Sequence, residues 1–172
     1  MNIILIGYMG AGKSSVGKKL SEVLGFDYLD LDDYIQEKEG KSINEIFSTK
    51  GEIYFRKIES KYLNEIISKS NSVISLGGGT PCYGNNMKHI KESKNTSSIY
   101  LKSSIISLTD RLLLEKDKRP LISHLKSKEE LQEFIGKHLF ERSAYYNLSD
   151  ITINTDRNSI DEVVESIVLK LF

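Results

Sequence analysis

Five short apolar segments alternate with longer helical patterns along this chain, and no other feature restricts its fold as strongly. Each segment has the length of a strand, is rich in β-branched or aromatic residues and ends in glycine or polar residues. Strands that alternate with helices predict an α/β fold with a mostly parallel sheet and helices on both faces. The five expected strands are Asn2–Ile6, Phe26–Leu29, Ser72–Leu76, Ser98–Leu101 and Asp150–Ile153.

The helical patterns between these segments have recognisable ends. The apolar residues of Lys13–Leu24 fall on one stripe, and Gly25 follows as a helix stop. Three serines precede a glutamate by three residues, the spacing of a capping box that opens a helix. These pairs are Ser42 with Glu45, Ser127 with Glu130 and Ser159 with Glu162.

Composition restricts the functional class. The chain has 172 residues and no linker, which predicts one domain. Its 24 basic and 24 acidic residues cancel, which argues against general binding to nucleic acid or to an anionic membrane. Cys82 is the only cysteine, so disulfides within the chain and multi-cysteine zinc sites are excluded. The apolar run Ile3–Ile6 is too short to span a membrane. We expect a cytoplasmic monomer that binds small molecules.

A phosphate-binding pattern follows the first expected strand directly. Residues Gly7–Ser14 read Gly-Tyr-Met-Gly-Ala-Gly-Lys-Ser and match Gly-x-x-x-x-Gly-Lys-Ser/Thr. Glycines let several backbone amides point inward at phosphate oxygens, Lys13 can reach the β- and γ-phosphates, and Ser14 can bind Mg²⁺. The alternative is a glycine-rich turn before a lysine. The position between a strand and a helix favours nucleotide binding.

Two aspartates follow the second expected strand. Alternation along a strand places Asp30 and Asp32 on one side, near the phosphate loop. One carboxylate can hold Mg²⁺ through water while the other accepts the proton of an attacking hydroxyl. The alternative is that these aspartates cap the next helix, a role for which Asp33 is the better candidate.

Three further segments are ambiguous by themselves. Gly77–Gly79 offer unobstructed amides to a ligand, or form a flexible turn. Arg56 lies near a helix start, where the macrodipole disfavours a cation, so it is a candidate anion ligand that Glu59 can orient. The charged stretch around Arg119 is either a solvated loop or a mobile lid that brings this arginine over a transferring phosphate.

In their order along the chain, these motifs resemble those of the shikimate kinase family. The triple glycine and the lid motif discriminate better than the phosphate loop and the aspartate pair, which many kinases share. The matching segments are Gly7–Ser14, Asp30–Asp32, Phe55–Arg56, Gly77–Gly79, Arg119–Leu121 and Arg142–Tyr146.

The resemblance implies a fold and an activity. The fold is a three-layer P-loop kinase fold related to nucleoside monophosphate kinases, with five parallel strands in the order 2-3-1-4-5. Residues 1–172 form one domain with a mobile lid around 114–125 and a substrate-binding helical region around 32–62. The activity is phosphorylation of the 3-hydroxyl of shikimate by ATP with Mg²⁺, in the pathway to chorismate and the aromatic amino acids.

The resemblance also implies roles for individual residues. Arg56 and Arg142 bind the shikimate carboxylate, while Asp32 and the amides of Gly78 and Gly79 take its ring hydroxyls. Lys13, Asp32 and Arg119 are the expected catalytic residues, Ser14 and Asp30 organise Mg²⁺, Phe47 and Phe55 wall the pocket, and Glu59 holds Arg56. Adenine contacts are expected from Arg157 and, as the nearest candidate upstream of the lid, Arg111. The expected ATP-binding residues are Gly10, Ala11, Gly12, Lys13, Ser14, Ser15, Arg119 and Arg157.

Two other functions are compatible with a phosphate loop. One is a different small-molecule or nucleoside monophosphate kinase, but the triple glycine and two arginines suit a small hydroxy acid better than a base. The other is a nucleotide-dependent switch without a phosphoryl acceptor. A GTPase would usually carry an Asn-Lys-x-Asp segment, and this chain has none.

Overall fold

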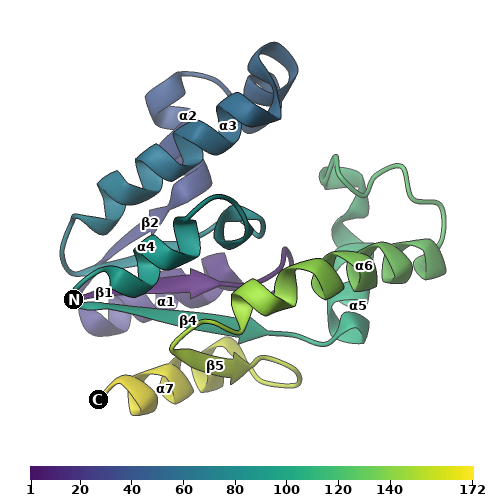
Figure 1. Cartoon of the computed structure of the whole chain (residues 1–172). Coiled ribbons are helices and arrows are strands. Elements are labelled where there is room, and N and C mark those ends of the chain that lie inside the picture. Colours follow the sequence, from purple (N-terminus) through teal and green to yellow (C-terminus); the bar gives the residue numbers. More distant parts are fainter.

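The computed structural model describes residues 1–172, and strand β1 lies at the centre of its sheet (Figure 1). All five strands are parallel in the order β2-β3-β1-β4-β5, which confirms the expected fold class and strand order. Ile4 of β1 pairs with Ile74 of β3 on one side and with Ser98 of β4 on the other. The strands are β1 (Asn2–Ile6), β2 (Asp27–Asp30), β3 (Ser72–Ser75), β4 (Thr96–Lys102) and β5 (Ile151–Asn154).

Helices cover both faces of this sheet. Helices α1 (Lys13–Leu24) and α7 (Ile160–Leu171) pack against each other and cover one face. Helix α4 (Asn86–Glu92) and the end of α6 (Lys128–Tyr146) lie over the other face, where Tyr146 packs on Tyr100 of β4. This arrangement is the predicted three-layer architecture. None of the helices is both long enough and apolar enough to cross a membrane.

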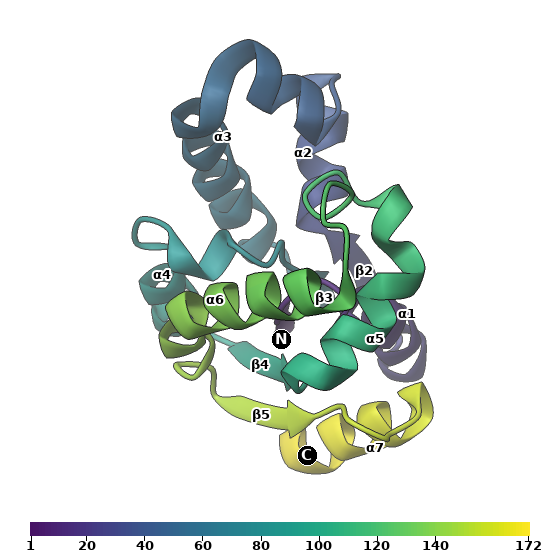
Figure 2. The ribbon, with the colours of Figure 1, turned by 90° about the vertical axis from the view of Figure 1, so that its right-hand side faces the viewer.

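Two regions extend away from the sheet on the same side (Figures 1 and 2). The first consists of α2 (Leu31–Glu39) and α3 (Ile43–Ile67), which pack against each other and span the expected substrate-binding region. The second follows α5 (Ile105–Glu115) and contains the 3₁₀ turn η2 (Lys116–Lys118) and the chain leading to α6, where the lid is expected. Ligands of parallel sheets bind at the carboxyl ends of the strands, so we expect the site where these ends meet the two regions.

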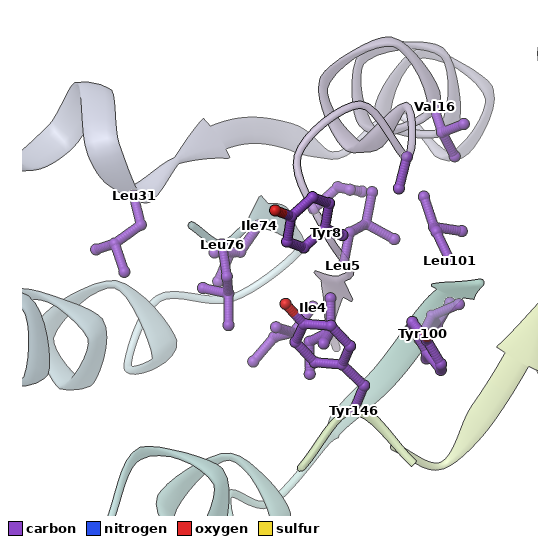
Figure 3. Packing of buried hydrophobic residues seen from close by; sticks show 14 of the residues in the cluster. Ile4, Leu5, Tyr8, Val16, Leu31, Ile74, Leu76, Tyr100, Leu101 and Tyr146 are labelled. Atoms are coloured by element: carbon purple, nitrogen blue, oxygen red, sulfur yellow. The ribbon is translucent and has the colours of Figure 1, made fainter. Parts of the chain in front are cut away.

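The core is built around β1, whose residues Ile3–Ile6 are fully buried, as expected for a central parallel strand covered on both faces. Tyr8, just after β1, and Tyr146 of α6 are among the largest buried side chains, and Figure 3 shows them among the aliphatic residues of β1 and β3. Because both rings are buried, their hydroxyl groups need hydrogen-bond partners inside the protein.

Two of the three predicted capping boxes are confirmed. Those at the starts of α3 and α7 have both reciprocal hydrogen bonds. The third prediction is wrong in part, because Ser127 caps α6 but the Glu130 carboxylate accepts from the amide of Lys126 instead.

The structure also corrects the reading of the aspartate pair. Strand β2 ends at Asp30 and helix α2 begins at Leu31, so strand alternation does not apply to Asp32. Asp30 rather than Asp33 caps this helix, and its Oδ1 accepts from the amides of Asp32 and Asp33 at 2.9 and 3.3 Å. The prediction of Asp33 as the cap is wrong because the helix starts earlier than expected.

Helix α3 is interrupted at Gly51, where φ is 82° and ψ is 172°. These angles lie outside the helical region and are accessible mainly to glycine. The second part of α3 therefore begins just after Gly51, which puts Arg56 near a helix start as the sequence predicted.

Candidate active site

The phosphate loop joins β1 to α1 and curls through glycine conformations. Gly10 and Gly12 have φ values of 81° and 93°, which other residues rarely adopt. The Lys13 ammonium group lies inside the loop and donates hydrogen bonds to the carbonyl oxygens of Gly7 and Tyr8 at 2.7 and 3.0 Å. The local sequence thus forms a cradle of backbone groups with a cation at its centre.

A cavity of about 450 Å³ opens beside this loop at the carboxyl ends of the strands. Most of its lining is polar, and it brings the phosphate loop together with both aspartates, two of the three glycines and the expected lid arginine. The predicted site residues that line it are Gly10, Gly12, Lys13, Ser14, Ser15, Asp30, Asp32, Gly78 and Arg119.

Burial shifts the titration of the charged groups in this cavity. Desolvation and the nearby Asp30 and Glu59 carboxylates raise the pKa of Asp32 to about 6. Desolvation also raises the pKa of Asp30, and it lowers the pKa of Lys13 to about 8 against the opposing effect of both aspartates. At neutral pH the carboxylate of Asp32 is ionised and Lys13 is protonated, so both groups are poised close to the working pH.

The three glycines after β3 each face a different charged group. A Cβ atom at Gly77 would lie 3.3 Å from a carboxylate oxygen of Asp32, and one at Gly78 would lie 3.2 Å from Nη1 of Arg142. A Cβ atom at Gly79 would lie 3.1 Å from Nη2 of Arg56. The missing side chains therefore let one carboxylate and two guanidinium groups converge on a short backbone segment.

Arg56 is held from two directions. Its Nη1 donates to Oε1 of the buried Glu59 at 2.8 Å, and the hydroxyl of Thr80 donates to the other oxygen of Glu59 at 2.8 Å. The ring of Tyr83 lies over the guanidinium carbon at 3.7 Å from the ring centre. The Nε atom of Arg56 is buried without a hydrogen bond and lies 3.7 Å from a carboxylate oxygen of Glu52, so Glu52 and Glu59 both face this guanidinium group.

Arg142 comes from the last turns of α6 and reaches the same segment from the opposite side. Its guanidinium carbon lies 5.7 Å from the ring centre of Tyr8. On the same helix, the Tyr146 hydroxyl donates to the carbonyl oxygen of Gly78 at 2.5 Å, which fixes the glycine segment against α6. Tyr146 belongs to the segment Arg142–Tyr146 that resembles the family, although no contact was predicted for it. Sequence analysis missed Thr80 and Tyr83 as parts of the site, because nothing in their local sequence marks them.

The expected apolar wall lies on the α3 side. Phe47 and Phe55 flank the Gly51 interruption, and their rings pack at 4.5 Å between centres. The Phe55 ring centre lies 5.2 Å from the guanidinium carbon of Arg56, so this aromatic pair gives the arginine side of the site an apolar boundary.

A smaller cavity of about 240 Å³ lies behind the phosphate loop, and Ala11 and Ser15 line it. Arg111 lines both cavities and donates to the carbonyl oxygens of Gly10 and Thr155 at 3.1 and 3.3 Å. The structure does not bring Arg157 into either lining. Arg157 is exposed in a left-handed conformation, with φ of 61°, next to the lining residue Asn158.

Arg119 lines the large cavity from the expected lid. Its Nε and Nη2 atoms both donate to one carboxylate oxygen of Glu115, at 2.8 and 2.6 Å. Because both groups are partly exposed, this ion pair adds little stability and leaves the arginine free to change partners.

Comparison with known proteins agrees with this geometry. The family model "Shikimate kinase" matches residues 9–172. The chain is 47% identical over 167 residues to the shikimate kinase of Flavobacterium johnsoniae, which covers 96% of both chains. It is 46% identical over 171 residues to that of Flavobacterium psychrophilum, which covers 99% of this chain and 98% of the relative.

Solved structures give the same result. The crystal structure of shikimate kinase from Bacteroides thetaiotaomicron superposes with a TM-score of 0.91 at 34% identity, over 99% of this chain and 98% of that one. The shikimate kinase from Acinetobacter baumannii, solved in complex with shikimate, has a TM-score of 0.86 at 32% identity, over 99% and 92% of the two chains. The chain described here therefore belongs to the shikimate kinase family, and it is an ATP-dependent phosphotransferase of the shikimate pathway.

Proposed function

We propose that this chain transfers the γ-phosphoryl group of ATP to the 3-hydroxyl of shikimate, giving shikimate 3-phosphate and ADP. The observation that carries this proposal is the convergence of Asp32, Arg142 and Arg56 on the three glycines beside the phosphate loop. A carboxylate next to the phosphates suits the reacting hydroxyl, and two guanidinium groups further along suit the acid group of the acceptor.

On the acceptor side, Arg56 and Arg142 bind the shikimate carboxylate. A planar guanidinium can donate two parallel hydrogen bonds to a carboxylate, which lysine cannot do. The Glu59 carboxylate and the ring of Tyr83 hold Arg56 in place before the acceptor arrives, which lowers the entropy lost on binding. The backbone amides of Gly78 and Gly79 donate hydrogen bonds to the ring hydroxyls of shikimate.

Asp32 orients the reacting hydroxyl and takes its proton. Phosphoryl transfer depends mainly on positioning and charge stabilisation, so a carboxylate with a pKa of about 6 suffices as the base. The oxygen attacks the γ-phosphorus as the bond to the bridging oxygen of ADP breaks, and the proton passes to the carboxylate of Asp32.

On the donor side, the amides of Gly10–Ser15, Ala11 included, bind the phosphates of ATP, and Lys13 and Arg119 stabilise the charge of the transferring group. Turning towards the phosphates requires Arg119 to leave Glu115. The base of ATP binds in the smaller cavity, with Arg111 and Arg157 as its candidate contacts.

The residues present also fit Mg²⁺. No three acidic, histidine or cysteine side chains gather to bind a metal alone, but Mg²⁺ in kinases needs only one or two protein ligands beside phosphates and water. Ser14 and Asp30, which line the cavity together, are these ligands. When bound, Mg²⁺ neutralises charge on the β- and γ-phosphates.

We propose further that residues 1–172 work as a single domain and a cytoplasmic monomer. Residues 114–125 then act as a mobile lid, and residues 32–62 as the substrate-binding region.

A coupled ADP-release assay tests the substrate. We expect ATP consumption with shikimate and little with other hydroxy acids or without an acceptor. Equal rates with and without shikimate would contradict the proposed reaction.

Conservative arginine variants test the acceptor site. Arg56→Lys and Arg142→Lys keep the charge, and each should weaken shikimate binding by about tenfold to a hundredfold without changing nucleotide affinity. The double variant should be non-additive, because both groups bind one carboxylate. The neutral amide of shikimate should lose much affinity for the wild type and little for the variants. Equal losses in both would mean that neither arginine binds the carboxylate.

A further inference from the structure

Tyr8 has two contacts that point in opposite directions. Its backbone carbonyl accepts a hydrogen bond from the Lys13 ammonium group at 3.0 Å, inside the phosphate loop. Its side-chain hydroxyl lies 2.8 Å from Nδ1 of His138 on α6, far away in the sequence. The ring between these two ends is 1% exposed, so Tyr8 has no free volume in which to move independently of its neighbours.

Both partners of this hydrogen bond are neutral at pH 7. Burial raises the pKa of Tyr8 to about 12, so its hydroxyl keeps its proton. Burial and the nearby Arg142 lower the pKa of His138, so the imidazole is neutral at pH 7. The bond therefore joins two uncharged groups, and the tautomer of His138 decides which of them donates. Phe134 packs edge-on against the imidazole at 4.4 Å between centres and fixes its plane.

His138 and Arg142 are four residues apart and share one face of α6. The guanidinium carbon of Arg142 lies 5.7 Å from the ring centre of the same Tyr8. Tyr8 thus contacts the phosphate-binding lysine through its backbone, and the helix that carries an acceptor-binding arginine through its side chain.

We propose that Tyr8 and His138 are positioning residues that couple nucleotide binding to acceptor binding. This inference rests on the proposed function, because it takes Arg142 as a ligand of the shikimate carboxylate. Its new content is the residue that links the two sites, because a change in the conformation of the phosphate loop would reach α6 through Tyr8.

Lys13 supplies the two states that such coupling requires. Its ammonium group uses two of its three donors on the carbonyl oxygens of Gly7 and Tyr8, so phosphate oxygens compete with these carbonyls for the same cation. A shift of the ammonium group towards phosphate weakens its bond to the Tyr8 peptide while the Tyr8 hydroxyl remains bound to His138, so a loop rearrangement acts on α6 and on Arg142. The reverse path exists as well, because coupling between two binding equilibria is reciprocal.

A binding experiment on the full chain tests the inference. Calorimetry measures the Kd of shikimate alone and with a saturating non-hydrolysable ATP analogue plus Mg²⁺, and the ratio of the two values is the coupling. We expect a ratio of about ten for the wild type. Tyr8→Phe and His138→Phe each remove the hydrogen bond but keep an aromatic ring, and each should lower the ratio by about threefold or more.

Two comparisons make this test specific. The double variant should lower the ratio no further than either single variant, since all three lack the same bond. Ser93→Ala, which removes a hydroxyl bonded to the carbonyl oxygen of His89 at the end of α4, lies outside the assigned site and should leave the ratio unchanged. Melting temperatures show whether a variant is destabilised as a whole. A general loss of stability would not change the ratio of the two Kd values, because both are measured on the folded protein.

The outcomes separate this inference from the proposed function. A wild-type ratio of one, a ratio that Tyr8→Phe leaves within twofold, or fully additive single variants would each overturn the coupling role. Failure of shikimate to bind under any condition would overturn the proposed function itself. The Kd of the nucleotide analogue, measured with and without shikimate, must give the same ratio and checks each result.

Discussion

The phosphate loop and the acceptor pocket lie side by side, yet they are built in different ways. The phosphate loop is one continuous segment, Gly7–Ser14, and most of its ligand groups are backbone amides. The proposed acceptor pocket draws Asp32 from α2, Arg56 from α3, the glycines from the chain after β3 and Arg142 from α6.

This difference separates two kinds of dependence on the fold. The nucleotide end depends on local backbone conformation, which glycines and one strand–helix connection largely determine. The acceptor end depends on the packing of distant elements, which places charged side chains where no local sequence could. Substitutions should therefore affect acceptor binding and turnover separately from nucleotide binding.

The largest effect should come from Asp32→Asn. The amide keeps the shape of the side chain but cannot take a proton, and turnover should fall by ~10²–10⁴. Nucleotide affinity should stay within a few-fold, because Asp32 belongs to the acceptor side. Steady-state kinetics and nucleotide titration measure the two effects, and near-normal turnover would remove Asp32 from the reaction.

Arg119→Ala should lower kcat by about a hundredfold while changing nucleotide affinity only a few-fold. The reason is that Arg119 pairs with Glu115 in this structure and must turn to the phosphates, so its charge counts most in the transition state. Equal losses of binding and turnover would show instead that Arg119 is an ordinary phosphate ligand, and the two ends of the site would then be less distinct.

The pH profile of kcat/KM should have two limbs, one from each region. Asp32 works as the ionised form with a pKa of about 6, so kcat/KM should fall below that pH. Lys13 works as the protonated form with a pKa of about 8, so kcat/KM should fall above that pH. The loss should reach about tenfold one pH unit beyond each value. Asp32→Asn should abolish the acid limb and move the basic limb to lower pH, because the Asp32 carboxylate raises the pKa of Lys13. Persistence of the acid limb in this variant would assign that limb to another group.

The smallest effect should come from Gly79→Ala. The added Cβ would lie 3.1 Å from Nη2 of Arg56, which must shift, and shikimate affinity should fall about fivefold. Gly136→Ala on α6 is a matched control, because its Cβ would meet only Ile105 at an ordinary 3.6 Å. Gly79→Ala should lower shikimate affinity more than ATP affinity, and Gly136→Ala should change neither. This result would support the difference between the acceptor pocket and the phosphate loop.

Sequence analysis was most successful where structure is local. The range Lys13–Leu24 is observed as α1, and the hydrogen bond from Arg56 to Glu59 follows from their spacing on one helix. Analysis failed at Asp30–Asp32, because the apolar Leu31 between two aspartates fits the period of a strand as well as a helix start.

Other parts of the site could not be predicted from the sequence because only the tertiary fold creates them. Tyr83 lies over Arg56, and Thr80 donates to Glu59, through contacts between elements that are separate in the chain. An aromatic residue in such a position has the same local pattern as any core residue. The expected adenine contact Arg157 shows the same limit, because its exposed position depends on the turn between β5 and α7.

Glu59 is buried against Arg56 of the proposed acceptor pocket and restricts how this enzyme can evolve. Its buried carboxylate depends on Arg56 and on the Thr80 hydroxyl for compensation. Replacing Arg56 with an uncharged residue would leave a buried charge without its partner, which destabilises a protein by about 3–5 kcal/mol. A lineage that acquires a neutral acceptor must therefore change Glu59 at the same time as Arg56. The same carboxylate that prepares the site for an acidic substrate closes the single-step routes to a different one.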